Sequence, residues 1–220
     1  MHGGSVSSYA YNNWGAVLFS VSLFILFALG FLKPAEKVEW RALGVFFSFL
    51  VVLFTEMYGF PLTIFILTSL LGKRYPALNP FSHPSGHLLL VFLGLSQSRM
   101  AMVVLHLFTN TLILSGLYLL FAGWRLIYYA GEGELVKEGI YSRIRHPQYL
   151  GILLIASGFL IQWPSLTTLF MWPILILAYY KLAMREEREL EKQFGKEFLE
   201  YREKVPAFIP GLILKPRKRD

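Results

Sequence analysis

The 220-residue chain contains no cysteine. This absence excludes disulfide bonds, thiolate metal sites and a cysteine nucleophile. Charge is also scarce, since Asp, Glu, Lys and Arg make up only 16% of the residues, whereas hydrophobic residues make up 55%. Soluble domains carry about 25% charged residues. The composition therefore predicts an integral membrane protein.

Long apolar runs predict the fold class, which is all-α and polytopic with about five transmembrane helices. About 20 apolar residues cross a bilayer as a helix. The runs that meet or approach this length are residues 14–32, 42–71, 100–129, 148–163 and 165–183. The second run overshoots the bilayer, so we expect either a kink near Gly59 and Pro61 or a span followed by a short re-entrant piece. The short sequence "WPS" joins the last two spans, which predicts a helical hairpin.

The distribution of Lys and Arg predicts how the spans are oriented. Most of these residues fall in 33–41, in 125–145 and after residue 181, whereas Lys73, Arg74 and Arg99 fall in the other loops. Because cytoplasmic loops are rich in Lys and Arg, we expect a multi-pass protein with its N-terminus outside and its C-terminus cytoplasmic. The net charge of +7 then indicates contact with anionic lipid and not with nucleic acid.

A second charged feature predicts a site at the membrane rim. Beyond the fifth span, apolar residues recur at helical spacing through residues 180–201, which predicts an amphipathic cytoplasmic helix. Glu187 lies on this stripe and Glu186 lies beside it. An unpaired carboxylate on an apolar face is costly, so we expect a cationic partner. Arg145 and His146 precede the fourth span on the same side, and the two groups together predict a pocket for a zwitterionic ligand.

Two motifs carry a resemblance to a known family. They are "GIYSRIRHPQYLG" (139–151) and "REERELEKQFGKEFLEYREKVPAFIP" (185–210). Their order, their spacing and the hairpin between them resemble the C-terminal half of the isoprenylcysteine carboxyl methyltransferase and phospholipid methyltransferase superfamily. The resemblance covers roughly the last 80 residues.

The resemblance implies that S-adenosylmethionine binds between the hairpin and the cytoplasmic loop. The cofactor-binding residues that it implies are Tyr141, Arg145, His146, Pro147, Tyr149, Gly151, Glu186 and Glu187. Gly131 and Gly133 resemble a Gly-x-Gly element of phospholipid methyltransferases, although they also suit a flexible turn. Residues 1–220 would form a single membrane domain, with 1–130 as the acceptor-side region and 131–220 as the cofactor-binding region.

The expected reaction is methyl transfer to a small or lipophilic acceptor, which is a carboxylate, an amine or a thiol. An in-line displacement on a sulfonium requires alignment and the exclusion of water, and it needs no metal. In this hypothesis Glu186 or Glu187 binds the ammonium or the ribose hydroxyls. Arg145 and the backbone N–H groups of the helix that opens at Pro147 receive the carboxylate.

Two further residues are candidates for catalysis on the acceptor side. Glu56 is an acid within the second predicted span, where it would be an acceptor ligand or a general base. Alternatively, its side chain snorkels to, or is exposed at, the membrane interface on the outer side. His106 and Asn110 lie one turn apart in the third span, where they would line the acceptor cavity or form an interhelical hydrogen bond. His83 and His87 have metal-like spacing, but Pro84 and Gly86 oppose a helix there, so we expect no metal site.

Two alternative functions remain open from the sequence. Membrane sterol reductases resemble this superfamily in their C-terminal region and use NADPH, although they have more spans. A non-catalytic carrier or assembly protein would use the polar rim only to bind anionic lipid.

Overall fold

The computed structural model describes residues 49–51, 53, 86–131 and 133–211. Throughout these residues all regular secondary structure is helical and no strand occurs. The predicted all-α class is confirmed for this part of the chain. The first predicted span and most of the second lie outside the described residues, as do the kink near Gly59 and the candidate Glu56; of the second span, residues 49–51 and 53 are described and helical.

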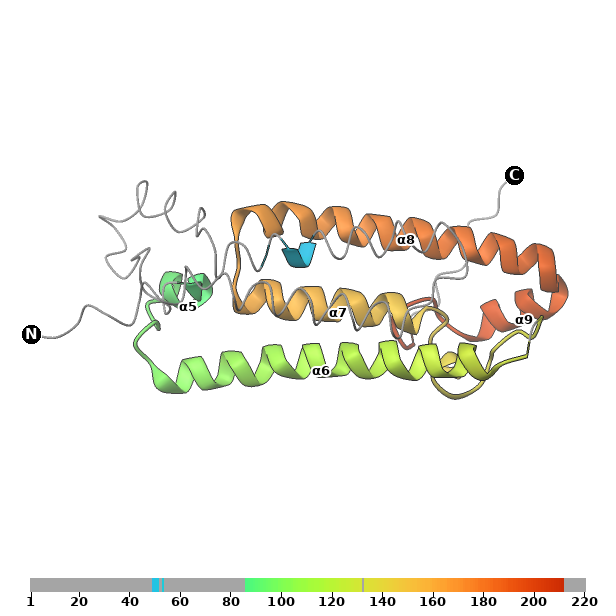
Figure 1. Ribbon diagram of the computed structural model, residues 1–220, viewed down its shortest axis with the longest axis horizontal. Helices are drawn as coiled ribbons and strands as arrows, with labels where there is room; N and C mark the ends of the chain where they lie inside the picture. Colours follow the sequence, from blue (N-terminus) through green and yellow to red (C-terminus); the bar gives the residue numbers. More distant parts are fainter. Residues whose placement is uncertain (1–48, 52, 54–85, 132, 212–220) are drawn as a thin grey trace, which may run out of the picture. The chain divides into compact units, whose positions relative to one another are not determined.

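The helices follow the predicted order (Figure 1). They are α5 (Leu88–Phe92), α6 (Arg99–Tyr129), the 3-10 helix η3 (Gly139–Ser142), α7 (Pro147–Gln162), α8 (Leu166–Phe194) and α9 (Lys196–Lys204). Pro147 opens α7 at the first helical position, where the missing N–H costs nothing. The bounds of α6 and α7 agree with the predicted third and fourth spans to within a residue.

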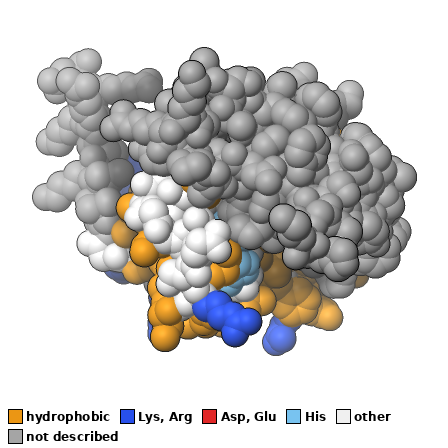
Figure 2. All heavy atoms as spheres, turned by 90° about the vertical axis from the view of Figure 1, so that its left-hand side faces the viewer, with side chains coloured by type: hydrophobic (Ala, Val, Ile, Leu, Met, Phe, Trp, Pro, Cys, Tyr) orange, Lys and Arg blue, Asp and Glu red, His pale blue; other side chains and the backbone are white. Residues whose placement is uncertain are grey.

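Two of the described helices, α6 and α8, are long and apolar enough to cross a membrane. Only 22% of the most apolar window of each helix is buried, so neither is the enclosed core helix of a soluble domain. Seen from the end that holds α5, the described surface shows hydrophobic side chains among backbone and uncharged atoms, with a few Lys or Arg side chains (Figure 2). Met100, at the start of α6, is 74% exposed. These features indicate a membrane protein, whereas the count of five spans and the transmembrane hairpin stay predictions, since α7 has 16 residues.

The chain divides into two compact units. Unit 1 comprises Met1–Ile113 and Ala156–Leu175, and unit 2 comprises Leu114–Ile155 and Ile176–Asp220. Helices α6, α7 and α8 each contribute a part to both units. The predicted division at residue 130 stays a prediction.

Within unit 2, α6 and α7 approach closely at glycines. A Cβ atom added to Gly151 would lie 2.6 Å from the carbonyl oxygen of Gly116, and one added to Gly116 would lie 2.5 Å from that of Gly151. A Cβ on Gly123 would come within 3.1 Å of both Pro147 and Gln148. Because small residues let helix backbones approach in membranes, this contact holds the start of α7 against α6.

Helix α8 continues well past the predicted end of the fifth span, but the amphipathic stripe is not one continuous helix. It is interrupted at Gly195, which has φ 52° and ψ −121°, a conformation that glycine adopts at low cost. The chain turns there and α9 begins. Phe198 and Tyr201 of α9 are therefore buried with Val205, against Leu135, Leu190 and Phe194. The turn at Gly195 therefore packs the apolar residues of α9 against those at the end of α8.

Candidate active site

The start of α7 and the C-terminal part of α8 bring opposite charges together within unit 2. The Arg145 guanidinium donates to Glu187 Oε1 from Nε at 2.9 Å and from Nη2 at 2.7 Å. The same oxygen lies 3.0 Å from His146 Nε2. Arg145 and Glu187 are 10% and 7% exposed at their side chains. The predicted cationic partner of the double glutamate is confirmed.

Glu186 takes part in the same network through the other side of His146. Its Oε2 lies 3.5 Å from His146 Nδ1, and Tyr149 donates its hydroxyl hydrogen to Oε1 at 2.5 Å. Both ring nitrogens of His146 thus face carboxylate oxygens, which only accept hydrogen bonds. Both nitrogens are then donors, and the ring is the imidazolium cation.

The segment that follows α9 completes the network. Arg145 Nη1 donates to the carbonyl oxygens of Arg202, at 2.9 Å, and of Val205. The backbone N–H groups of Arg145 and His146 donate to the carbonyls of Pro206 and Ala207, at 2.9 and 3.0 Å. Arg145 and both N–H groups therefore already have partners inside the protein. Arg145 bridges α8 to the end of α9, and its expected role toward a ligand carboxylate stays a prediction.

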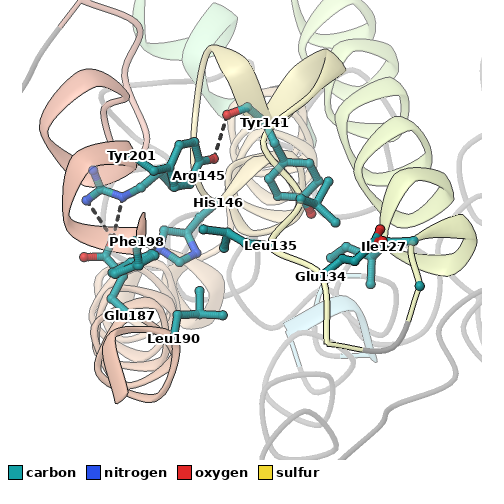
Figure 3. Close-up of a pocket in the computed structure, with 13 residues that line it drawn as sticks. Ile127, Glu134, Leu135, Tyr141, Arg145, His146, Glu187, Leu190, Phe198 and Tyr201 are labelled. Atoms are coloured by element: carbon teal, nitrogen blue, oxygen red, sulfur yellow. Dashed lines mark hydrogen bonds and ion pairs between the residues drawn. The ribbon is translucent and has the colours of Figure 1, made fainter. Parts of the chain in front are cut away.

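A cavity of about 240 Å³ adjoins this network (Figure 3). Its charged and phenolic lining comprises Glu134, Tyr141, Arg145, His146, Glu187 and Tyr201. Its apolar lining comprises Ile127, Ala130, Leu135, Val136, Leu190 and Phe198, and Gly131 completes it. Apolar walls with a few convergent charged groups are typical of small-molecule sites.

The pKa of His146 reflects the balance of burial and hydrogen bonding. Burial acts to lower the pKa of the ring, but the hydrogen bonds to Glu186 and Glu187 outweigh it and raise the pKa above its ordinary value of 6.5. Burial also raises the pKa of the Tyr141 and Tyr201 phenols, which stay protonated. Tyr201 donates its hydroxyl hydrogen to the backbone carbonyl of Tyr141 at 2.6 Å, which ties α9 to η3.

The other predicted cofactor residues lie close by but do not line the cavity. The Tyr149 ring stacks on His146 with centroids 5.7 Å apart. Pro147 and Gly151 pack against α6, at Gly123 and Gly116 respectively. Glu186 reaches the cavity only through His146. Their roles toward a cofactor stay predictions.

The candidate His106 belongs to unit 1, in different surroundings. Its Nδ1 donates to the carbonyl of Met102 at 2.8 Å, so the bond is within α6 and not between helices. Its ring contacts those of His87 and Trp163, with centroids 5.0 and 6.4 Å away. His87 donates from Nδ1 to the carbonyl of Gln162 at 2.8 Å. Its possible partner for a metal, His83, lies outside the described residues, among which no group of three or more metal-binding side chains occurs.

The sequence motifs did not identify every residue that forms the cavity. Phe198 and Tyr201 were visible on the amphipathic stripe but were not assigned to the site. Glu134 and Leu135 come from the loop after α6, which has no periodicity that would have identified them. The carbonyls of Arg202 and Val205 are backbone groups, which no side-chain motif reports.

Residues 97–197 match the family model described as phospholipid methyltransferase. This match includes the start of α7 and all of α8. The predicted resemblance to the isoprenylcysteine carboxyl methyltransferase and phospholipid methyltransferase superfamily is confirmed for this part of the chain.

Individual relatives agree with the family match. Protein-S-isoprenylcysteine O-methyltransferase B of Arabidopsis thaliana is 33% identical over 85 residues, which are 35% of this chain and 40% of the relative. Protein-S-isoprenylcysteine O-methyltransferase of Saccharomyces cerevisiae is 35% identical over 77 residues, which are 34% of this chain and 32% of the relative. The cobalt-zinc-cadmium resistance protein CzcN of Cupriavidus metallidurans is 35% identical over 93 residues, which are 41% and 43% of the two chains.

The chain thus spans less than half the length of each of these relatives. No solved structure gives a significant match.

Proposed function

We propose that the chain is a membrane methyltransferase that uses S-adenosylmethionine and acts on a lipophilic acceptor. The observation that carries this proposal is the cavity beside Arg145, His146 and Glu187, because 11 of the 13 residues that line it lie within the residues that match a methyltransferase family. A reductase that binds NADPH would need unpaired cations for the extra phosphate, whereas Arg145 and His146 are both paired here.

The residues around the cavity fit the methyl donor. Phe198, Leu135 and Leu190 offer apolar surface for the adenine ring of the donor. The carboxylates of Glu134 and Glu187 suit the cationic and hydroxyl groups of the donor. When bound, the donor supplies an electrophilic methyl group. The chain's own part is to align this group with the acceptor and to exclude water, which the buried network and apolar walls favour. Pro147, Tyr149, Gly151 and Glu186 support the site through His146 and through the contact of α7 with α6.

For the acceptor, we propose a lipophilic molecule with an oxygen nucleophile that enters from the bilayer. Two of the relatives are named as protein-S-isoprenylcysteine O-methyltransferases. Glu56 and His106 remain candidates for the acceptor side, and no metal is required. We also propose that the N-terminus lies outside and the C-terminus lies in the cytoplasm. In this proposal five spans form one membrane domain.

The first prediction concerns Glu187, which holds both cations of the network. Glu187→Gln removes the charge and leaves Arg145 and His146 without their shared carboxylate. We expect the affinity for S-adenosylmethionine to fall at least about tenfold, because buried charges lose their partner and the wall of the cavity shifts. Isothermal titration calorimetry of the detergent-purified protein measures this affinity.

The matched control is Glu189→Gln, two residues further along α8, where the side chain is 52% exposed and pairs with Arg185. This variant should bind the donor as the wild type does. The proposal fails if the wild type binds NADPH and not S-adenosylmethionine, or if it binds neither ligand. A methyl group transferred from labelled donor to extracted lipid would support it directly.

A further inference from the structure

Glu134 is a charged side chain at the cavity that does not take part in the Arg145–His146–glutamate network. Arg145 and the His146 imidazolium are both bound to Glu187, and Glu186 faces the other nitrogen of His146. These two cations and two anions neutralise one another. Glu134 also lines the cavity, and no hydrogen bond or ion pair of its carboxylate occurs among the described residues. Counted together with Glu186, the described groups at the cavity therefore comprise three carboxylates and two cations.

Two cations of unit 2, Lys137 and Arg202, have partners other than Glu134. Lys137, three residues along the same loop, pairs with Glu197 at 2.6 Å. Arg202 of α9 pairs with Glu191 at 2.9 Å.

The loop geometry holds Glu134 at the cavity. Its backbone N–H donates to the carbonyl of Gly131 at 3.2 Å, and Gly133 has φ 83°, so residues 131–134 form a tight turn at the end of α6. Figure 3 shows Glu134 beside Ile127, across the cavity from the Arg145–Glu187 pair. A ligand in the cavity thus meets a neutral network on one side and a negative charge on the other.

We propose that Glu134 faces the sulfur of the bound methyl donor and is a specificity-determining residue, which favours this positively charged molecule over its neutral, demethylated product. This inference rests on the proposed function. Both molecules share the same ammonium and carboxylate, and they differ at sulfur, which is a sulfonium in the donor and a thioether in the product. A carboxylate that faces the sulfur attracts the first and not the second.

The preference matters because the reaction removes the positive charge from the sulfur. A lone pair of the acceptor forms the new bond to the methyl carbon, and the electron pair of the broken sulfur–carbon bond stays on sulfur, which becomes neutral. The attraction to Glu134 is then lost when the product forms. Glu134 therefore favours donor capture and product release within the same cavity.

Calorimetry with both ligands tests the inference. Glu134→Gln should weaken the binding of S-adenosylmethionine about threefold or more, a size typical of a partly exposed charge pair, and leave that of S-adenosylhomocysteine unchanged. The matched control is Glu138→Gln, in the same loop, whose side chain is exposed and does not line the cavity. It should change neither affinity. In the wild type, added salt should weaken donor binding more than product binding.

The outcomes separate the inference from the proposed function. Suppose that the wild type binds both ligands, and that Glu134→Gln weakens both affinities equally or changes neither affinity. The inference is then overturned and the proposed function stands. If the wild type binds neither ligand, both are overturned. Thermal unfolding of each variant checks that the fold is intact. The salt series in the wild type tests the preference for the donor without any substitution, and equal salt dependence for the two ligands would overturn it.

Discussion

Glu187 is the residue on which the charged network depends. A single oxygen, Oε1, receives the Arg145 guanidinium and faces His146, and all three side chains are largely buried. Buried ion pairs repay the cost of desolvation only when the geometry and the remaining hydrogen bonds are good. Arg145 meets this condition, because its Nη1 also donates to two backbone carbonyls. The network therefore joins α7, α8 and the segment after α9 through one guanidinium.

The pKa of His146 predicts how stability depends on pH. Since the folded-state pKa is raised above 6.5, the stabilising contribution of the imidazolium is complete below that value and is lost as the pH rises through the folded-state pKa. The free energy of unfolding should thus decrease as the pH rises above 6.5. It should change by at most about 1.4 kcal/mol for each unit by which the pKa is raised. Thermal unfolding at a series of pH values measures this.

His146→Gln should be less stable at low pH and should lack this decrease. Glu200→Gln, an exposed carboxylate of α9, should keep it. A wild-type stability that rises with pH over this range would contradict the assignment of a cationic His146.

Among the helices, the contact of α6 with α7 positions the site most directly. Gly116 and Gly151 place two backbones so close that neither position has room for a Cβ atom. Because His146 and Pro147 lie about one helical turn before Gly151 on the chain, the approach of α7 to α6 also sets where the charged network begins.

Substitution at either glycine should therefore destabilise unit 2. Gly116→Ala and Gly151→Ala each place a methyl group against a backbone oxygen, which cannot rotate away, and we expect a loss of about 1–3 kcal/mol from overpacking. Thermal unfolding in detergent measures the loss. Ser115→Ala, at an exposed position next to Gly116 on α6, should have little effect. Equal stability of all three variants would show that the helices do not pack this closely.

For the whole molecule, the proposed topology places the two ends of α6 on opposite sides of the membrane. The natural absence of cysteine makes this directly testable, because a single introduced thiol is the only one present. We expect Gln97→Cys to react with a membrane-impermeant maleimide from outside, and Ser142→Cys to react only from the cytoplasmic side. Both positions are exposed and neither lines the cavity. Labelling of both thiols from one side would contradict the topology.

The sequence by itself determined the class of protein, the order of the described helices and the pairing of the two charged motifs. Apolar runs report helices because the backbone must satisfy its own hydrogen bonds in a bilayer. The pairing of Arg145 and His146 with Glu186 and Glu187 was predictable because charges on apolar surfaces need partners, and few oppositely charged groups were within reach.

Only the tertiary structure decided the rest of the site. The turn at Gly195 folds α9 back, so Phe198 and Tyr201 form a wall of the cavity, and the segment after α9 offers its carbonyls to Arg145. Glu134 is identified as a candidate only because the structure shows that the other charged residues that line the cavity are paired. These features depend on contacts between residues far apart in the chain and on backbone atoms, and neither leaves a periodic pattern in the sequence.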